Sequence, residues 1–192
     1  MTTPLRIEVP SGVYHLTARG NNREPIYLDD TDCRTFMSML ARVAEKYRWI
    51  VLAYCLMRNH YHLIVQIPFG GLSRGIDELN GGYARRTNRR HGRTGHLFGR
   101  RFHSTLIEGD THLLEACRYV VLNPVRAGLC AEPEAWPWSS YRTCAGLDFP
   151  SPFLALDELL RLFGESPRQA SASYCQFVSA ALAPVAATAT EV

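Results

Sequence analysis

Two histidines separated by a single residue are the first side chains in this sequence whose spacing could support chemistry. His60 and His62 fall within residues 60–67, an apolar, β-rich stretch that predicts a strand. Because residues two apart on a strand face the same side, the two imidazoles would lie together and could hold a divalent metal. The alternative interpretation is that backbone groups or water satisfy both side chains on an ordinary sheet face.

A tyrosine and an asparagine one helical turn apart form the second candidate. Residues 112–122 have helical spacing of apolar side chains, and Tyr119 and Asn123 would be neighbours on one face. A phenol close to a metal can lose its proton and act as a nucleophile, and an amide oxygen is a ligand that Mg²⁺ accepts. The alternative is a core tyrosine and an asparagine that merely precedes Pro124, which is predicted to stop the helix.

Together the two candidates describe one reaction. A metal on His60 and His62 would polarise a phosphodiester and stabilise the charge that develops on it. Tyr119 would attack the phosphorus and keep one half of a cut strand covalently attached. No water is needed for this first step, so the bond energy would be kept for rejoining the strand.

Basic residues gather in one part of the chain, although its net charge is only +3. No acidic residue lies between Glu78 and Glu108, and this window contains Arg85, Arg86, Arg89, Arg90, Arg93, Arg100 and Arg101. Such a run is usually a solvated helix face, but here no acidic partner for salt bridges lies within the window. The window therefore predicts contact with a polyanion. The excess of arginine over lysine in the chain as a whole is a separate matter, because a GC-rich genome favours arginine codons.

The order of predicted elements favours an α+β fold, a ferredoxin-like antiparallel sheet with packed helices. Strands are predicted at residues 12–19, 49–57, 60–67 and 102–108, and helices after an N-cap at 29–32 and at 72–87 and 112–122. Residues 89–99 are predicted to form a loop. We expect a catalytic domain at residues 1–145, a C-terminal helical extension packed on it at 146–183, and a disordered tail at 184–192.

Composition excludes several classes of protein. With 46% hydrophobic and 20% charged residues, the chain is expected to be globular and not disordered. It has no apolar run near the roughly 18 residues of a membrane helix, and its first residues contain no apolar signal core. We therefore expect no membrane partner and a cytoplasmic, nucleoid-associated protein. The six cysteines show no two-residue spacing, which disfavours a zinc site or a redox motif.

Several longer blocks of sequence resemble one known family. They are Gly12-Val13-Tyr14-His15, Arg19-Gly20-Asn21-Asn22-Arg23, Met57-Arg58-Asn59-His60-Tyr61-His62, Gly95-His96-Leu97-Phe98 and Arg118-Tyr119-Val120-Val121-Leu122-Asn123-Pro124 with the residues that follow it. On these blocks the sequence resembles the REP-associated tyrosine transposases, within the wider group of HUH single-strand DNA endonucleases and IS200-like transposases.

The resemblance implies a role for each residue of the candidate site. His60 and His62 fall on the metal-binding HUH pair, for Mg²⁺ or Mn²⁺, with Tyr61 as the bulky residue between them. Tyr119 falls on the nucleophile, which forms a 5′-phosphotyrosine link and frees a 3′-hydroxyl. Asn123 falls where related transposases place a third metal ligand, often glutamine, so this position departs from the family pattern.

The resemblance also implies the substrate, which is single-stranded DNA that folds into hairpins at repeated palindromes. Arg19, Asn21, Asn22 and Arg23 lie where the family is expected to contact a short guide sequence beside the hairpin. The other predicted DNA contacts, mostly to phosphates, are Arg85, Arg86, Arg89, Arg90, Arg93, Arg100, Arg101 and Arg126. One tyrosine makes one covalent link at a time, and the sequence does not choose between a monomer and a homodimer.

Three other functions remain open at this stage. The chain could be a hairpin DNA-binding factor with weak or lost catalysis, although a binder needs neither His60, His62 nor Tyr119. It could be an RNA-binding domain on the same fold, which would present aromatic platforms on its sheet. It could also be a metal-dependent phosphodiesterase that uses water, and such an enzyme would remain active when Tyr119 is replaced by phenylalanine.

Overall fold

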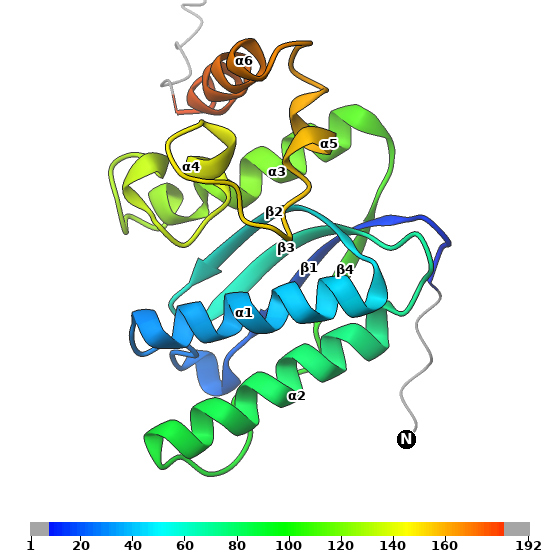
Figure 1. Cartoon of the computed structure of the whole chain (residues 1–192). Helices are drawn as coiled ribbons and strands as arrows, with labels where there is room; N and C mark the ends of the chain where they lie inside the picture. The colour runs from blue at the N-terminus through cyan, green and yellow to red at the C-terminus, as the bar shows by residue number, and fades with distance from the viewer. Residues whose placement is uncertain (1–7, 183–192) are drawn as a thin grey trace, which may run out of the picture.

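An antiparallel sheet covered by helices on both faces forms the centre of the molecule (Figure 1). The computed structural model describes residues 8–182. Its strands are β1 (Val13–Arg19), β2 (Ile50–Met57), β3 (His60–Gln66) and β4 (His103–Ile107), in the spatial order β2-β3-β1-β4. The helices are α1 (Asp30–Tyr47), α2 (Leu72–His91), α3 (Gly109–Arg126), α4 (Tyr141–Cys144), α5 (Leu156–Leu160) and α6 (Pro167–Ser179), with short 3-10 turns η1 (Asn21–Arg23) and η2 (Pro133–Ala135). This arrangement confirms the predicted ferredoxin-like α+β fold.

Neighbouring residues of β3 point to opposite faces of the sheet, which separates the core from the candidate site. The ring of Tyr61 is fully buried and lies 4.9 Å from the ring of Phe36 on α1. The ring of the next residue, His62, lies 5.8 Å from the ring of Tyr119 on α3. The sheet therefore divides the molecule into a side covered by α1 and α2 and a side covered by α3 (Figure 1).

Helix α2 ends later than the sequence predicts. The expected loop at residues 89–99 is wrong for its first three residues, because α2 continues through Arg89 and Arg90 to His91. Basic side chains in the last turn favour a helix C-terminus, where the carbonyl groups carry partial negative charge. Gly92 then adopts the left-handed conformation, with φ 61°, and ends the helix.

Helix α3 runs through Pro124, so the prediction that this proline stops the helix is wrong. A proline removes one backbone hydrogen bond because it has no N–H. The bonds that follow are nevertheless kept: Ala127 N–H donates to the carbonyl of Asn123, and Leu129 N–H donates to the carbonyl of Pro124, each over 2.9 Å. The helix therefore reaches Arg126, one turn past Asn123, before the chain leaves it.

The C-terminal part of the described chain packs on the α3 side of the sheet (Figure 1). Helix α6 contacts α3 and α5, and α5 also contacts β2. The predicted boundary between a catalytic domain and a helical extension at 146–183 stays a prediction, and the predicted tail at 184–192 lies outside the described residues. None of the helices in residues 8–182 is both long enough and apolar enough to cross a membrane.

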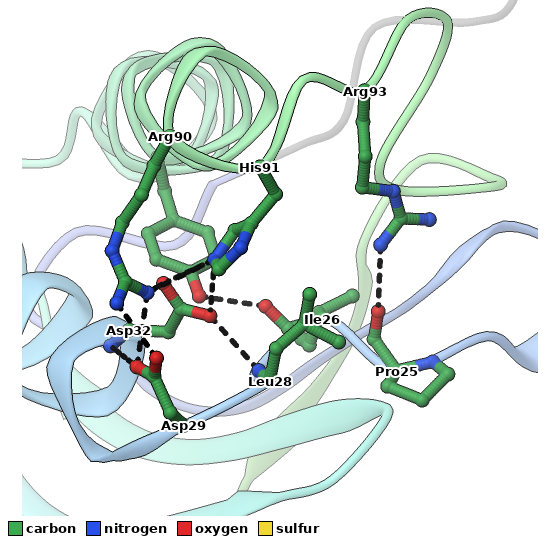
Figure 2. A network of polar contacts seen from close by, with 9 residues as sticks. Pro25, Ile26, Leu28, Asp29, Asp32, Arg90, His91 and Arg93 are labelled. Atoms are coloured by element: carbon green, nitrogen blue, oxygen red, sulfur yellow. Dashed lines mark hydrogen bonds and ion pairs between the residues drawn. The ribbon is translucent and has the colours of Figure 1, made fainter.

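A polar network joins the end of α2 to the start of α1 (Figure 2). Asp32 is 1% exposed and accepts hydrogen bonds from Arg90 (2.6 Å), His91 (2.9 Å) and the N–H of Leu28 (2.9 Å). Arg90 also contacts Asp29, whose side chain caps α1 by accepting from the N–H of Asp32. A buried carboxylate is tolerated here because charged and polar donors surround it.

Within residues 8–182, acidic side chains pair with Arg90 and Arg93 of the clustered arginines, which corrects the argument made from the sequence. Arg90 pairs with Asp29 and Asp32, and Arg93 pairs with Glu24 at 2.7 Å. The absence of acidic residues from the window at 79–107 was a poor guide, because the partners come from a distant part of the chain. Arg90 and Arg93 therefore hold the segment that follows η1, and the case for them as DNA contacts is weakened.

Replacing Asp32 with alanine is expected to lower the free energy of unfolding by about 2–4 kcal/mol, because the N–H of Leu28 and the side chain of His91 lose this acceptor and Arg90 loses one of its two carboxylate partners. Chemical denaturation measures this difference. The control is Asp77→Ala on the exposed face of α2, which should change stability by less than about 0.5 kcal/mol. Equal effects of the two changes would contradict a structural role for the network.

The effect of Asp32→Ala should also depend on pH. Burial alone would raise the pKa of Asp32, but hydrogen bonds from His91, Leu28 N–H and Arg90 together lower it. The stabilisation is therefore present above the ordinary aspartate pKa of about 3.9 and is lost as the pH falls through the lower value in the fold. The stability difference between wild type and variant should shrink as the pH is lowered from about 5 to about 2.

Candidate active site

The pairing of β1 with β3 creates the candidate site. In this antiparallel register Thr17 lies opposite His62 and Arg19 lies opposite His60. The rings of His60 and His62 lie 5.0 Å apart between centroids, so both imidazoles occupy the face that α3 covers. The geometry thus brings the two histidines together as their spacing predicts.

His15 on β1 belongs to the same cluster. Its Nε2 lies 2.9 Å from Nδ1 of His62, and the hydroxyl of Thr17 lies 3.3 Å from the same Nδ1. His62 itself is only 5% exposed, and within residues 8–182 its Nε2 is buried without a hydrogen-bond partner. A buried ring nitrogen that carries a lone pair and no partner is what a metal ligand would leave in a protein without its metal.

All three imidazoles are held in the neutral form. Burial, with a smaller effect from Arg19, lowers the pKa of His60 to about 4. Burial, followed by His15, His60 and Arg19, lowers the pKa of His62 to about 3, and burial also lowers the pKa of His15. Neutral imidazole is the form that binds a divalent metal, so the cluster is suited to a metal at neutral pH.

Tyr119 projects from α3 over this cluster and is accessible. Its side chain is 42% exposed, and its ring centroid lies 5.8 Å from that of His62 and 5.9 Å from that of His15. The alternative interpretation of Tyr119 as a core residue is therefore wrong. The guanidinium of Arg126 lies 5.3 Å from the centre of the Tyr119 ring, so a positive charge stands beside the phenol.

Asn123 lies one turn beyond Tyr119, but its side chain is directed to its own helix. The amide nitrogen donates to the carbonyl of Tyr119 at 2.8 Å and approaches that of Val120 at 3.5 Å. Val120 is the residue whose usual backbone donor is missing because position 124 is a proline. With the nitrogen engaged in this way, the amide oxygen is the atom left for another partner, and a role as metal ligand stays a prediction.

A basic hollow of about 610 Å³ lies next to the histidines. Its lining brings together two groups of predicted DNA contacts that are far apart in the sequence. One group is Arg19, Asn21, Asn22 and Arg23, and the other is Arg100 and Arg101; Thr17, His103 and two glycines complete the lining. Thr17 links the hollow to the site, because its hydroxyl also lies 3.3 Å from Nδ1 of His62. A strand of nucleic acid in the hollow would therefore be led toward the histidines.

Close backbone contacts form this hollow. The N–H of Asn21 donates to the carbonyl of Leu97 at 2.9 Å, and the N–H of Gly99 donates to the carbonyl of Arg19 at 3.1 Å. A side chain at Gly20 would come within 2.2 Å of the carbonyl oxygen of Glu24, so only glycine fits there. The motif Arg19-Gly20-Asn21-Asn22-Arg23 is thus a tight turn fixed against residues 97–99.

The remaining predicted DNA contacts, apart from Arg93 beside Glu24, lie in two other places. Arg85, Arg86, Arg89 and Arg90 line a separate hollow of about 550 Å³ beside Asp32 and Met39 of α1. This second hollow lies on the α1–α2 side of the sheet, whereas Tyr119 lies on the α3 side (Figure 1). Arg126 lies beside Tyr119 on α3. The clustered arginines therefore do not all line one hollow.

Comparison with known proteins identifies the family. A family model described as "Transposase IS200 like" matches residues 8–123, which include β1 to β4, both histidines and Tyr119. The chain belongs to the IS200-like transposase family. IS200-like transposases are tyrosine transposases, enzymes that act on single-stranded DNA by transesterification.

A curated relative and a solved structure are similar to this IS200-like transposase. A Haemophilus influenzae protein named as a REP-associated tyrosine transposase is 28% identical over 141 residues, which cover 68% of this chain and 80% of that protein. A solved structure of a REP-associated tyrosine transposase bound to a REP hairpin superposes with a TM-score of 0.66. It shares 19% identity and covers 80% of this chain and 93% of that one, so it shows a common fold.

Sequence reasoning about this IS200-like transposase missed two polar residues that contact the histidines. Asn59 lies 2.7 Å from Nδ1 of His60 through its side-chain oxygen, and Thr17 contacts His62. The expected alternation of β1 could have predicted the contact of Thr17 with His62, but only if the register of β1 against β3 were already known. Asn59 gives no such signal, since an asparagine at a tight turn between strands is ordinary.

The tight turn carries backbone strain that a glycine should relieve. Asn22 and Arg23 both have positive φ, 52° and 61°, a conformation that costs a non-glycine residue about 1–2 kcal/mol. Arg23→Gly should raise the free energy of unfolding by up to about 1 kcal/mol, because the strain removed exceeds the entropy cost of glycine. Thermal or chemical denaturation measures the change.

Arg100→Gly is the matched control, since Arg100 lines the same hollow without a positive φ. It should leave stability unchanged or lower it slightly. A loss of stability in Arg23→Gly as large as that in Arg100→Gly would show that the turn is not strained.

Proposed function

We propose that this chain is a transposase of the REP-associated type, which cleaves single-stranded DNA beside palindromic hairpins through Tyr119. The observation that carries the proposal is the position of an exposed tyrosine over two neutral, paired histidines, with ring centroids 5.8 Å apart for Tyr119 and His62. A DNA-binding protein without catalysis requires none of these three residues.

The proposed reaction is a transesterification at one phosphodiester. A bond forms between the phenol oxygen of Tyr119 and the phosphorus, and the bond between that phosphorus and the 3′-oxygen of the preceding nucleotide breaks. The phenol proton passes to solvent, and the departing 3′-oxygen takes up a proton. The 5′-phosphate stays on Tyr119, and its attack by a 3′-hydroxyl reverses the step and joins two strands.

The donor set at the site fits a divalent metal. His60 and His62 would hold Mg²⁺ or Mn²⁺ through their free ring nitrogens, and the bound metal would polarise the phosphate and stabilise its developing charge. Within residues 8–182 no three His, Cys, Asp or Glu side chains group together as a metal site. Further ligands would therefore come from the oxygen of Asn123, from water or from the DNA phosphate itself.

Protein residues around Tyr119 would favour the attack. The guanidinium of Arg126, 5.3 Å from the centre of the ring, places a positive charge where it could contact the phosphate that Tyr119 attacks. The exposed position of Tyr119 on α3 leaves it open to a DNA strand that approaches from outside. Histidines 60 and 62 remain neutral and do not compete as cations for the phosphate.

The hollow beside the site is proposed to bind the unpaired bases next to the hairpin. Its lining supplies arginine guanidinium groups for phosphates and stacking, and asparagine amides for base edges. The relative of known structure was bound to a REP hairpin, which is consistent with a hairpin substrate for this chain. The arginines on α2 lie on the other side of the sheet and would contact phosphates away from the cleaved bond.

The test is a covalent-adduct assay with single-stranded hairpin oligonucleotides labelled at either end, in Mg²⁺ or Mn²⁺. We expect a metal-dependent protein–DNA band on a denaturing gel for the wild type, and loss of the band in Tyr119→Phe and in His60→Ala. The retained label should be the one on the 3′ side of the cut, because Tyr119 keeps the 5′-phosphate. Binding of the same oligonucleotides should persist in Tyr119→Phe.

Two outcomes would overturn the proposal in different ways. DNA binding without any adduct, under either metal, would indicate a hairpin-binding factor that has lost catalysis. Cleavage without an adduct that survives Tyr119→Phe would indicate a water nucleophile and therefore a hydrolytic phosphodiesterase.

The unpaired arginines of α2 should contribute to affinity through phosphates. Arg86 and Arg89 are exposed and form no ion pair within residues 8–182, unlike Arg90. Replacing either with alanine should reduce the slope of log affinity against log salt concentration by about 0.7–0.9 without changing which sequence is cut. Arg168→Ala on α6 is the control and should leave the slope unchanged, while an equal slope in all variants would exclude α2 from the DNA interface.

A further inference from the structure

The two paired histidines share a feature that their spacing alone does not require. In each of them Nδ1 is engaged by another side chain of the protein. Nδ1 of His60 lies 2.7 Å from the side-chain oxygen of Asn59, and Nδ1 of His62 lies 2.9 Å from Nε2 of His15. The partners come from different elements, the β2–β3 turn and strand β1, yet they contact the same atom of the ring.

The contact at His60 fixes which nitrogen carries the proton. The amide nitrogen of Asn59 donates to the carbonyl of Arg23 at 2.8 Å, so the amide oxygen must face His60. An amide oxygen can only accept a hydrogen bond, and therefore Nδ1 of His60 must be the protonated nitrogen. The lone pair of the neutral ring is then on Nε2.

The turn that carries Asn59 is itself held in place. The backbone carbonyl of Asn59 accepts from the N–H of Gly20 at 2.8 Å, and the carbonyl of Arg58 accepts from the N–H of Ile26 at 2.9 Å. Asn59 is therefore bonded on two sides to the tight turn at residues 19–23. Its side chain has little freedom to rotate and release His60.

The contact at His62 leads to the same tautomer by a different route. Nδ1 of His62 has two neighbours, Nε2 of His15 and the hydroxyl of Thr17, and either can accept a hydrogen bond from a protonated Nδ1. Nε2 of His62 is buried and has no partner within residues 8–182. A proton on Nε2 would be a buried donor without an acceptor, whereas a lone pair there is what a metal requires.

We propose that Asn59 and His15 are positioning residues, which hold His60 and His62 by Nδ1 so that both Nε2 atoms are presented to one divalent metal. The proposal rests on the proposed function, since it assumes that these histidines bind a metal. In this proposal His15 contacts Nδ1 of His62 and is not itself a metal ligand. Partners of this kind commonly change metal affinity by 10–100-fold when they are removed.

The proposal is tested by Mn²⁺ binding to the full chain without DNA, with free Mn²⁺ measured by its electron paramagnetic resonance signal. Asn59→Ala and His15→Ala should each raise the dissociation constant about 10–100-fold. His15→Gln should recover most of the affinity, because the glutamine oxygen can accept from Nδ1 of His62. His62→Ala should abolish the site, and His96→Ala, an exposed histidine that contacts none of these residues, should bind as the wild type does.

Thermal unfolding of each variant separates positioning from folding. A variant with the wild-type melting temperature and weaker Mn²⁺ binding supports the proposal. Wild-type affinity in both Asn59→Ala and His15→Ala would overturn it, as would the absence of Mn²⁺ binding that depends on His62 in the wild type. Weakened Mn²⁺ binding in a protein that forms no DNA adduct would keep the positioning roles and overturn only the proposed reaction.

Discussion

The antiparallel pairing of β1 with β3 is the constraint on which the rest of the site depends. This register places Thr17 opposite His62 and Arg19 opposite His60, and it brings the turn after β1 beside the turn before β3. A slip of one residue would move both histidines to the face packed against α1 and α2. The buried aromatic side chains on that face, such as Tyr61 against Phe36, make such a slip costly. The core thus sets the geometry of the site from the opposite side of the sheet.

The two sides of the sheet have different tasks. On the α3 side, Tyr119, the histidines and the basic hollow meet around one point. On the other side, the C-terminal end of α2 holds the segment after η1 through Arg90 and His91 (Figure 2). The hydroxyl of Tyr83 on α2 also donates to the carbonyl of Ile26 at 2.6 Å. The tight turn of the hollow is therefore bonded at one end to β3 and continues at the other into a segment that α2 anchors.

Local patterns in the sequence predicted the strands, their alternation and the shared face of His60 and His62, because each depends on neighbouring residues. Contacts between distant segments could not be predicted in this way. The acidic partners of Arg90 come from the start of α1, and helix α3 passes through Pro124 because later backbone bonds compensate for the missing donor. Asn59 is an ordinary turn residue by type, and only the fold shows that its amide connects the carbonyl of Arg23 to His60.

The central claim is that His60 and His62 offer Nε2 to one metal beneath Tyr119. A crystal of the protein soaked in Mn²⁺ tests this claim most directly, with the ion located by its anomalous scattering. The account predicts one strong peak bonded to Nε2 of both histidines on the side of the sheet that carries Tyr119. Nδ1 of His60 should still be hydrogen-bonded to Asn59, and Nδ1 of His62 to His15. A peak bonded through Nδ1, or bound elsewhere on the chain with both histidines free, would contradict it.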